Sequence, residues 1–182
     1  MVFFIVYPTT NWLAGRRSHP YSLFVEQELG VPFVPQFIWF YLSMYVLFFF
    51  PPFFLSPENL RRLAKELMLA TGVAGVMFLI FPGRLGFSRT LPTDPFYRVF
   101  FDGLFALDPP FNLVPSLHVV YSTAIVLAIS AHAGAGVRFA LHAWLVLTVA
   151  STVLVHQHHF LDVVTGLALA LLMRFYWKKK HV

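Results

Sequence analysis

Long apolar segments, separated by short polar or proline-rich breaks, constrain this chain more than any other feature of its sequence. Each segment is close to the roughly 20 residues that an α-helix needs to cross the hydrocarbon core of a bilayer. Helices are the expected structure there, because a lone strand would leave its backbone groups unpaired in lipid. Five spanning helices are therefore predicted, over residues 33–50, 63–81, 113–131, 138–156 and 160–177.

The composition supports a membrane protein. The 182 residues are 58% hydrophobic and 12% charged, whereas a soluble domain is about 45–50% apolar and about 25% charged. A soluble fold of this size could not hide so much apolar surface. We predict a single membrane-embedded domain over residues 1–182, with an all-α, multi-pass transmembrane helical bundle as its fold.

Two segments lie outside these spans. Residues 2–8, VFFIVYP, are too short to cross a bilayer, and they lack the basic region and cleavage site of a signal peptide. They are expected to form an interfacial stub or the remainder of a longer helix. Residues 82–112 hold arginines, aspartates and prolines, and are expected to form a functional loop or a linker.

Alternation of the predicted helices brings four of their ends to one membrane face, which we call the site face. Five cations fall on this face and eight on the other, so the positive-inside rule places the site face outside the cytoplasm of a cell-membrane protein. The net charge of +5 comes from residues at segment ends, which favours lipid headgroups or anionic substrates over nucleic acid. The site-face cations are Arg16, Arg17, Arg84, Arg89 and Arg98; the others are Arg61, Arg62, Lys65, Arg138, Arg174, Lys178, Lys179 and Lys180.

Two histidine motifs fall on the site face, NLVPSLH at residues 112–118 and HQHHFLD at residues 156–162. His158 and Asp162 are four residues apart, which puts them on one side of a helical turn. A carboxylate bound to one imidazole nitrogen fixes the tautomer and raises the basicity of the other nitrogen. Such a histidine can act as a nucleophile toward phosphorus.

The first motif suits an anion and a proton donor. Ser116 is expected at a helix start, where free backbone N–H groups attract anions. His118 would project from that first turn and could protonate a leaving alkoxide. Arg89, and with it Arg84, could hold phosphoryl oxygens through a bidentate guanidinium.

Each of these residues also has a structural interpretation. Ser116 could be a helix cap, and Asp162 an acid favoured by the helix dipole. The arginines could anchor headgroups, and the histidine cluster could bind a metal ion or haem. The functional interpretation is favoured because both histidine motifs fall on the same face by independent helix counting.

At these residues the chain resembles a known family. PSLH and the following H-x3-D are similar to the second and third motifs of the phosphatidic acid phosphatase type 2 superfamily. The longer strings most resemble its branch that includes inositol phosphorylceramide synthase and sphingomyelin synthase. The resemblance covers about residues 30–175 and implies a six-helix core, with His158 as nucleophile, Asp162 as its orienting partner and His118 as acid.

The chain departs from the family pattern at two cations. The usual first-motif lysine is missing from GRLGFSRTLP, which leaves Arg84 and Arg89, and Thr152 stands where the third motif usually has arginine. We predict that Arg89 and Arg84 bind the phosphate, together with Ser116, Asn112 and Thr152.

The predicted function is a lipid phosphatase or phosphotransferase that forms a phosphohistidine. Its substrate would be a lipid phosphate or phosphodiester, and its acceptor water or a lipid alcohol. No metal or other cofactor is expected, because the imidazoles and arginines supply both proton transfer and charge. The alternatives are a non-enzymatic bundle that binds haem or metal through its histidines, and an inactive member of the superfamily.

Overall fold

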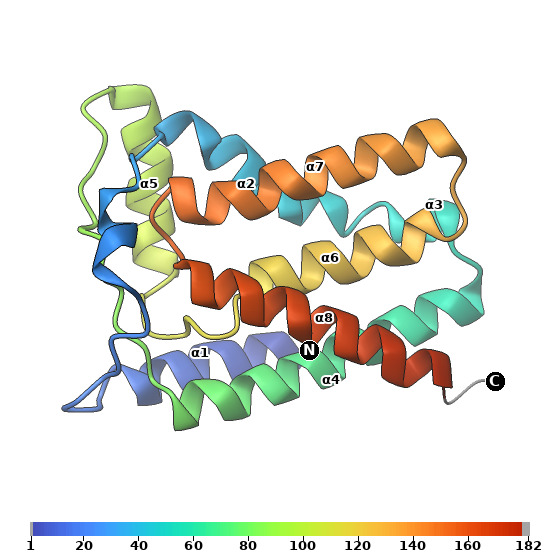
Figure 1. Cartoon of the computed structure of the whole chain (residues 1–182), viewed down its shortest axis with the longest axis horizontal. Coiled ribbons are helices and arrows are strands. Elements are labelled where there is room, and N and C mark those ends of the chain that lie inside the picture. The colour runs from blue at the N-terminus through green and yellow to red at the C-terminus, as the bar shows by residue number, and fades with distance from the viewer. Residues whose placement is uncertain (1, 180–182) are drawn as a thin grey trace.

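Helices running side by side make up most of the computed structural model, which describes residues 2–179 (Figure 1). Within these residues the regular elements are all helical, so the predicted all-α bundle is confirmed. The helices are α1 (Val2–Ala14), α2 (Ile38–Leu47), α3 (Pro51–Phe54), α4 (Pro57–Ile80), α5 (Pro95–Leu107), α6 (Leu117–Ser130), α7 (Ala135–Leu154) and α8 (Phe160–Lys179), with 3-10 turns at Glu26–Gly30 and Pro35–Phe37.

Three helices, α4, α7 and α8, are long and apolar enough to cross a membrane. They correspond to the predicted spans 63–81, 138–156 and 160–177. The span predicted at 113–131 is the shorter apolar helix α6, whose 14 residues rise about 21 Å. The end of α4, the start of α6, the end of α7 and the start of α8 lie toward one end of the bundle, which is the site face (Figure 1).

The segment predicted as one helix over residues 33–50 is broken into pieces. Pro35 opens a 3-10 turn, α2 has only ten residues, and Pro51 begins the four-residue α3. Proline lacks a backbone N–H and crowds the turn before it, so it belongs at helix starts and not in helix interiors. The prolines at both ends of this segment therefore set the limits of α2.

The N-terminal apolar segment is a full helix, α1, which packs along α4. The contact is close at Gly75, where a Cβ atom would collide with the Val6 side chain. The helix extends beyond the apolar residues 2–8 and continues to Ala14.

The predicted loop 82–112 contains a 13-residue helix, α5, which corrects that prediction. Asp94 caps it by accepting a hydrogen bond from the Phe96 N–H (2.8 Å), and Pro95 occupies its first turn. α5 runs across the ends of α2 and α7, transverse to the long helices of the bundle (Figure 1).

α6 is the centre of the bundle, since α2, α4, α7 and α8 all pack against it and nearly all of its residues are buried. A helix that is apolar on every side is expected in such a position. α8 comes closest at Gly166, where a Cβ atom would lie 2.8 Å from the Ser116 carbonyl oxygen and 3.0 Å from the Val119 Cβ. The absence of a side chain at Gly166 therefore lets the start of α6 lie against α8.

Gly166→Ala should lower the thermal stability of the detergent-solubilised protein, because the new methyl group meets backbone. Overpacking of this kind costs about 1–3 kcal/mol. Gly72→Ala is the matched control: it also lies in a long helix, has no atom within 4 Å of its Cβ position, and should gain up to about 1 kcal/mol of helix propensity. Equal stabilisation by both variants would show that the α6–α8 contact tolerates a side chain.

Candidate active site

The turn after α7 presents the second histidine motif. It is closed by two hydrogen bonds of the Schellman type, from the Gln157 N–H to the Thr152 carbonyl (3.0 Å) and from the His156 N–H to the Val153 carbonyl (2.9 Å). Glycine usually occupies the left-handed position of this motif. Here His156 occupies it, with φ of 56°, at a cost of about 1–2 kcal/mol for a residue with a side chain.

Contacts of the His156 ring offset that cost. Its Nε2 lies 2.9 Å from the Val31 carbonyl oxygen, and the ring stacks on Phe87 at 4.0 Å between centroids. Burial lowers the pKa of His156, which keeps this ring neutral and suited to stacking. The turn is therefore held by segments that lie far from it in sequence.

His158 and Asp162 form the predicted pair. The His158 Nδ1 lies 3.1 Å from Asp162 Oδ2, and both side chains are almost fully buried. The His159 N–H also donates to Asp162 Oδ2 (2.9 Å), and the His158 N–H donates to the Thr152 carbonyl (2.9 Å). With Nδ1 directed at the carboxylate, Nε2 is the ring nitrogen that remains for chemistry.

The first motif meets the second through the backbone. The Ser116 N–H donates to the Asp162 carbonyl (3.0 Å), which sets the start of α6 beside the start of α8. His118, in the first turn of α6, then lies with its ring centroid 6.4 Å from that of His158. Its Nε2 is buried and has no hydrogen-bond partner within residues 2–179. The two predicted catalytic histidines are thus neighbours.

Tyr41 of α2 covers His118, and the sequence did not point to it. The two rings stack at 4.0 Å between centroids, and the Tyr41 side chain is fully buried. Its hydroxyl has no hydrogen-bond partner in the described part of the chain. Stacking restricts the orientation of the His118 ring.

Arg89 lies beside the histidine turn. Its Nη2 donates to the Asp108 carbonyl (2.6 Å) and to Gln157 Oε1 (3.2 Å), and its Nη1 donates to the Phe105 carbonyl (3.4 Å). Within residues 2–179 no carboxylate lies at ion-pair distance from this guanidinium. Burial lowers its pKa, but arginine stays protonated in proteins. Neutral oxygens therefore hold a cation that can still bind an anion.

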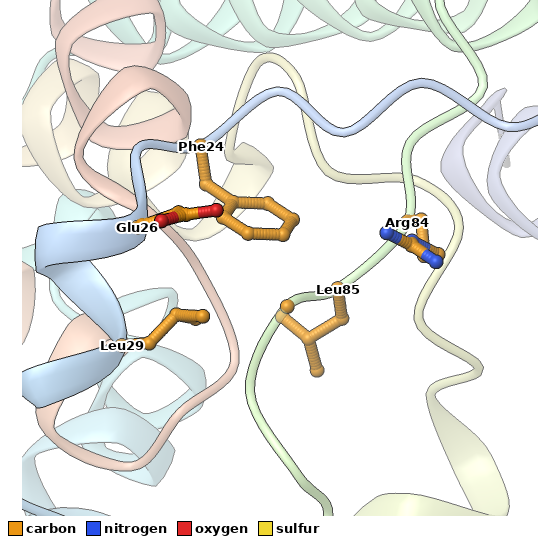
Figure 2. A pocket seen from close by; sticks show the side chains of 6 residues that line it. Phe24, Glu26, Leu29, Arg84 and Leu85 are labelled. Atoms are coloured by element: carbon orange, nitrogen blue, oxygen red, sulfur yellow. The ribbon is translucent and has the colours of Figure 1, made fainter.

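Arg84 occupies a different position. It is exposed and donates to Ser22 Oγ (3.0 Å). An open hollow of about 620 Å³ lies between Arg84 on one side and Glu26 on the other (Figure 2). The structure thus brings Arg89, and not Arg84, to the histidine turn.

The other three predicted substrate-binding residues are buried and bonded to protein. Ser116 Oγ caps α6 by accepting from the Val119 N–H (3.4 Å), and Thr152 Oγ1 donates to the Val149 carbonyl (2.8 Å). The Asn112 Nδ2 donates to α1, at the Tyr7 carbonyl (2.8 Å) and Thr10 Oγ1 (2.9 Å). These contacts agree with a structural role for all three, and their binding of substrate stays a prediction.

A second histidine–carboxylate contact supports the turn from outside. The His159 Nδ1 lies 3.1 Å from Glu28 Oε2, which also accepts from the Phe160 N–H (2.9 Å). The Gly86 N–H donates to His159 Nε2 (3.0 Å), so Nε2 is unprotonated and Nδ1 donates to Glu28. Glu28 lies with Glu26 in a short 3-10 helix that is far from the histidine motif in sequence, so no local spacing links it to His159, and it could not be identified from the sequence.

Within residues 2–179 no group of three or more histidine, aspartate or glutamate side chains is close enough to hold a metal ion. The chemistry that the described residues offer is a nucleophilic imidazole at His158, a second imidazole at His118 and a guanidinium at Arg89.

The fold and this site define an all-α protein with membrane-spanning helices and a paired-histidine centre at one end of the bundle. Residues 88–176 match the model of the PAP2 superfamily. The matched segment includes Arg89, His118, His158 and Asp162. No curated protein matches the chain, and neither does any solved structure.

Acid should destabilise the fold through His159. Burial lowers its pKa, so below the unfolded value of about 6.5 the unfolded chain binds the proton more tightly and stability falls. We expect a lower melting temperature at pH 5 than at pH 7.5. His159→Gln, which cannot be protonated, should reduce this difference; His142→Gln, an exposed control, should not. An unchanged pH dependence in His159→Gln would contradict this role.

Proposed function

We propose that this chain is an integral membrane enzyme that removes or transfers a phosphate group of a lipid through a phosphohistidine at His158. The observation that carries the proposal is the buried His158–Asp162 pair, with His118 as its neighbour and Arg89 on the adjoining Gln157. The match to the PAP2 superfamily supports phosphatase or phosphotransferase chemistry. The spanning helices support a substrate that resides in the bilayer.

The first step forms a bond between His158 Nε2 and phosphorus and breaks the bond between phosphorus and the leaving oxygen. The negative charge of the bound phosphate draws a proton onto His118, which then gives that proton to the leaving oxygen. Asp162 holds the His158 Nδ1–H and stabilises the positive charge that develops on the ring. The products are the phosphohistidine and the free lipid alcohol.

In the second step the oxygen of water or of a lipid alcohol attacks phosphorus. The nitrogen–phosphorus bond breaks, the electron pair returns to His158 Nε2, and the neutral His118 accepts the proton of the attacking group. Water as acceptor makes the enzyme a phosphatase, and a lipid alcohol makes it a phosphotransferase. The strings NLVPSLH and HQHHFLD support the phosphotransferase branch named above.

Arg89 is the proposed phosphate-binding cation in place of the missing first-motif lysine. Its guanidinium reaches Gln157, the residue before the proposed nucleophile, and its partners at bonding distance among residues 2–179 are neutral oxygens. A guanidinium fork can donate two parallel hydrogen bonds to phosphoryl oxygens. Arg84, which is exposed, is proposed to bind lipid headgroups or to attract the substrate phosphate before it reaches Arg89.

His158→Ala should abolish phosphate release from a panel of lipid phosphates, assayed in detergent with and without acceptor lipids. Loss of a covalent nucleophile should remove several orders of magnitude in rate, or more than about 4 kcal/mol of transition-state stabilisation. His142→Ala, exposed and on the far half of α7, is the matched control. One tenth of the wild-type activity remaining in His158→Ala would eliminate the nucleophile assignment.

Arg89→Lys should slow phosphate release by the equivalent of about 1.5–3 kcal/mol, because an ammonium cannot reproduce the two hydrogen bonds of the fork. Arg89→Ala should cost more, and Arg84→Ala less. Melting temperatures separate this effect from loss of fold, since Arg89 also binds two backbone carbonyls. An inactive Arg84→Ala beside an active Arg89→Ala would exchange the two roles.

The site face is proposed to lie outside the cytoplasm, on the strength of the cation count. Lys180 of that count lies outside the described residues. The chain has no cysteine, and Thr93 is exposed near the start of α5. A Thr93→Cys variant should therefore react with an impermeant thiol reagent in intact cells. Reaction only after lysis would place the site on the cytoplasmic leaflet.

A further inference from the structure

The surface of α5 is divided into three sectors. At about 100° per residue, the residues that face the bundle form one sector, centred on Phe101 and Leu104, which are buried. Arg98 and Asp102, both exposed, form a second sector beside it. Phe96, Val99 and Leu107 fall in the third, which begins next to the charged sector and continues round the side of the helix that faces away from the bundle.

This third sector, the apolar flank of α5, is strongly exposed: Phe96 by 58%, Val99 by 70% and Leu107 by 85%. Gly103 and Ala106 fall in the same sector and are also exposed. The flank continues onto α2, because the half-exposed Trp39 contacts the rings of Phe96 and Phe100 at 5.9 and 4.8 Å between centroids. Tryptophan is enriched where a membrane protein meets the headgroup layer.

The orientation of α5 explains its division into a charged and an apolar flank. The helix lies across the ends of α2 and α7 on the site face, while the spanning helices run along the bundle (Figure 1). If those helices run along the membrane normal, α5 lies in the plane of the interface. A helix at that depth needs one flank in lipid and the other in water.

We propose that α5 is an in-plane interfacial helix, with the flank of Phe96, Val99 and Leu107 embedded among bilayer lipids and with Arg98 and Asp102 in the aqueous layer. The partner of this surface is the boundary between acyl chains and headgroups, and not a second protein. The flank is continuous with the apolar surface of α2 through Trp39, and the charges of α5 occupy a separate sector.

The embedded helix also sets the depth of the phosphate site, an inference that rests on the proposed function. The Phe105 and Asp108 carbonyls, in the last turn of α5 and just after it, accept hydrogen bonds from Arg89. Arg89 is therefore held at the level of the lipid phosphates. The substrate class that fits is a phospholipid or lipid phosphate that reaches the guanidinium without leaving the bilayer.

The absence of native cysteine allows a direct test. An environment-sensitive fluorophore is attached at Val99→Cys or at Asp102→Cys, and the protein is placed in phosphatidylcholine vesicles. Brominated acyl chains should quench the Val99 probe several-fold more than the Asp102 probe, and aqueous iodide should show the reverse order. Equal iodide quenching at both positions, or a Val99 probe shielded from both quenchers, would overturn the proposal.

Depth and catalysis are separable in this experiment. The same probes in a His158→Ala background should give the same quenching, since depth does not depend on turnover. Val99→Glu should raise the KM for lipid phosphate in vesicles and leave kcat unchanged, whereas Arg98→Glu, on the aqueous edge, should leave both unchanged. If Val99→Glu behaves like Arg98→Glu while the quenching order holds, the link from helix depth to substrate capture is wrong.

Discussion

The hydrogen bond from the Ser116 N–H to the Asp162 carbonyl is the contact on which the candidate site depends. It joins the first turn of α6 to the first turn of α8, and Gly166 provides the space for that approach. With these two turns side by side, His118 is adjacent to His158. Asp162 contributes to both, since its carbonyl joins the two turns and its carboxylate contacts the His158 ring. A backbone contact thus determines the distance between the two side chains that are proposed to act on one phosphorus.

The site carries two features that a fold built only for stability would avoid. One is a histidine in the left-handed position that glycine normally fills. The other is the partly buried guanidinium of Arg89, which has no carboxylate at bonding distance in the described part of the chain. Strained backbone and poorly compensated charge tend to occur where function requires them. In this protein both features lie next to the same residue pair, Gln157 and His158.

Much of this arrangement could be predicted from the sequence, because it follows from local periodicity. The four-residue spacing of His158 and Asp162, the long apolar runs of α4, α7 and α8, and their shared end all depend on helix geometry alone. The breaks in the predicted helix 33–50 were not predicted, although Pro35 and Pro51 mark them. The helix at residues 95–107 was not predicted either, although Asp94 and Pro95 form a typical helix start. Glu28, Tyr41 and Gly86 could not be predicted, because each meets its histidine through a long-range contact that no local pattern encodes.

The left-handed His156 has a consequence for the modularity of the chain. Its ring is held by the Val31 carbonyl and by Phe87, and the neighbouring His159 is held by Glu28 and Gly86. These four residues all precede the segment that matches the superfamily. The matched half is therefore not an autonomous unit: without the first 87 residues the turn would lose the contacts that offset its strain. The first 87 residues act as a scaffold for the histidine turn, and the two parts of the chain are expected to evolve together.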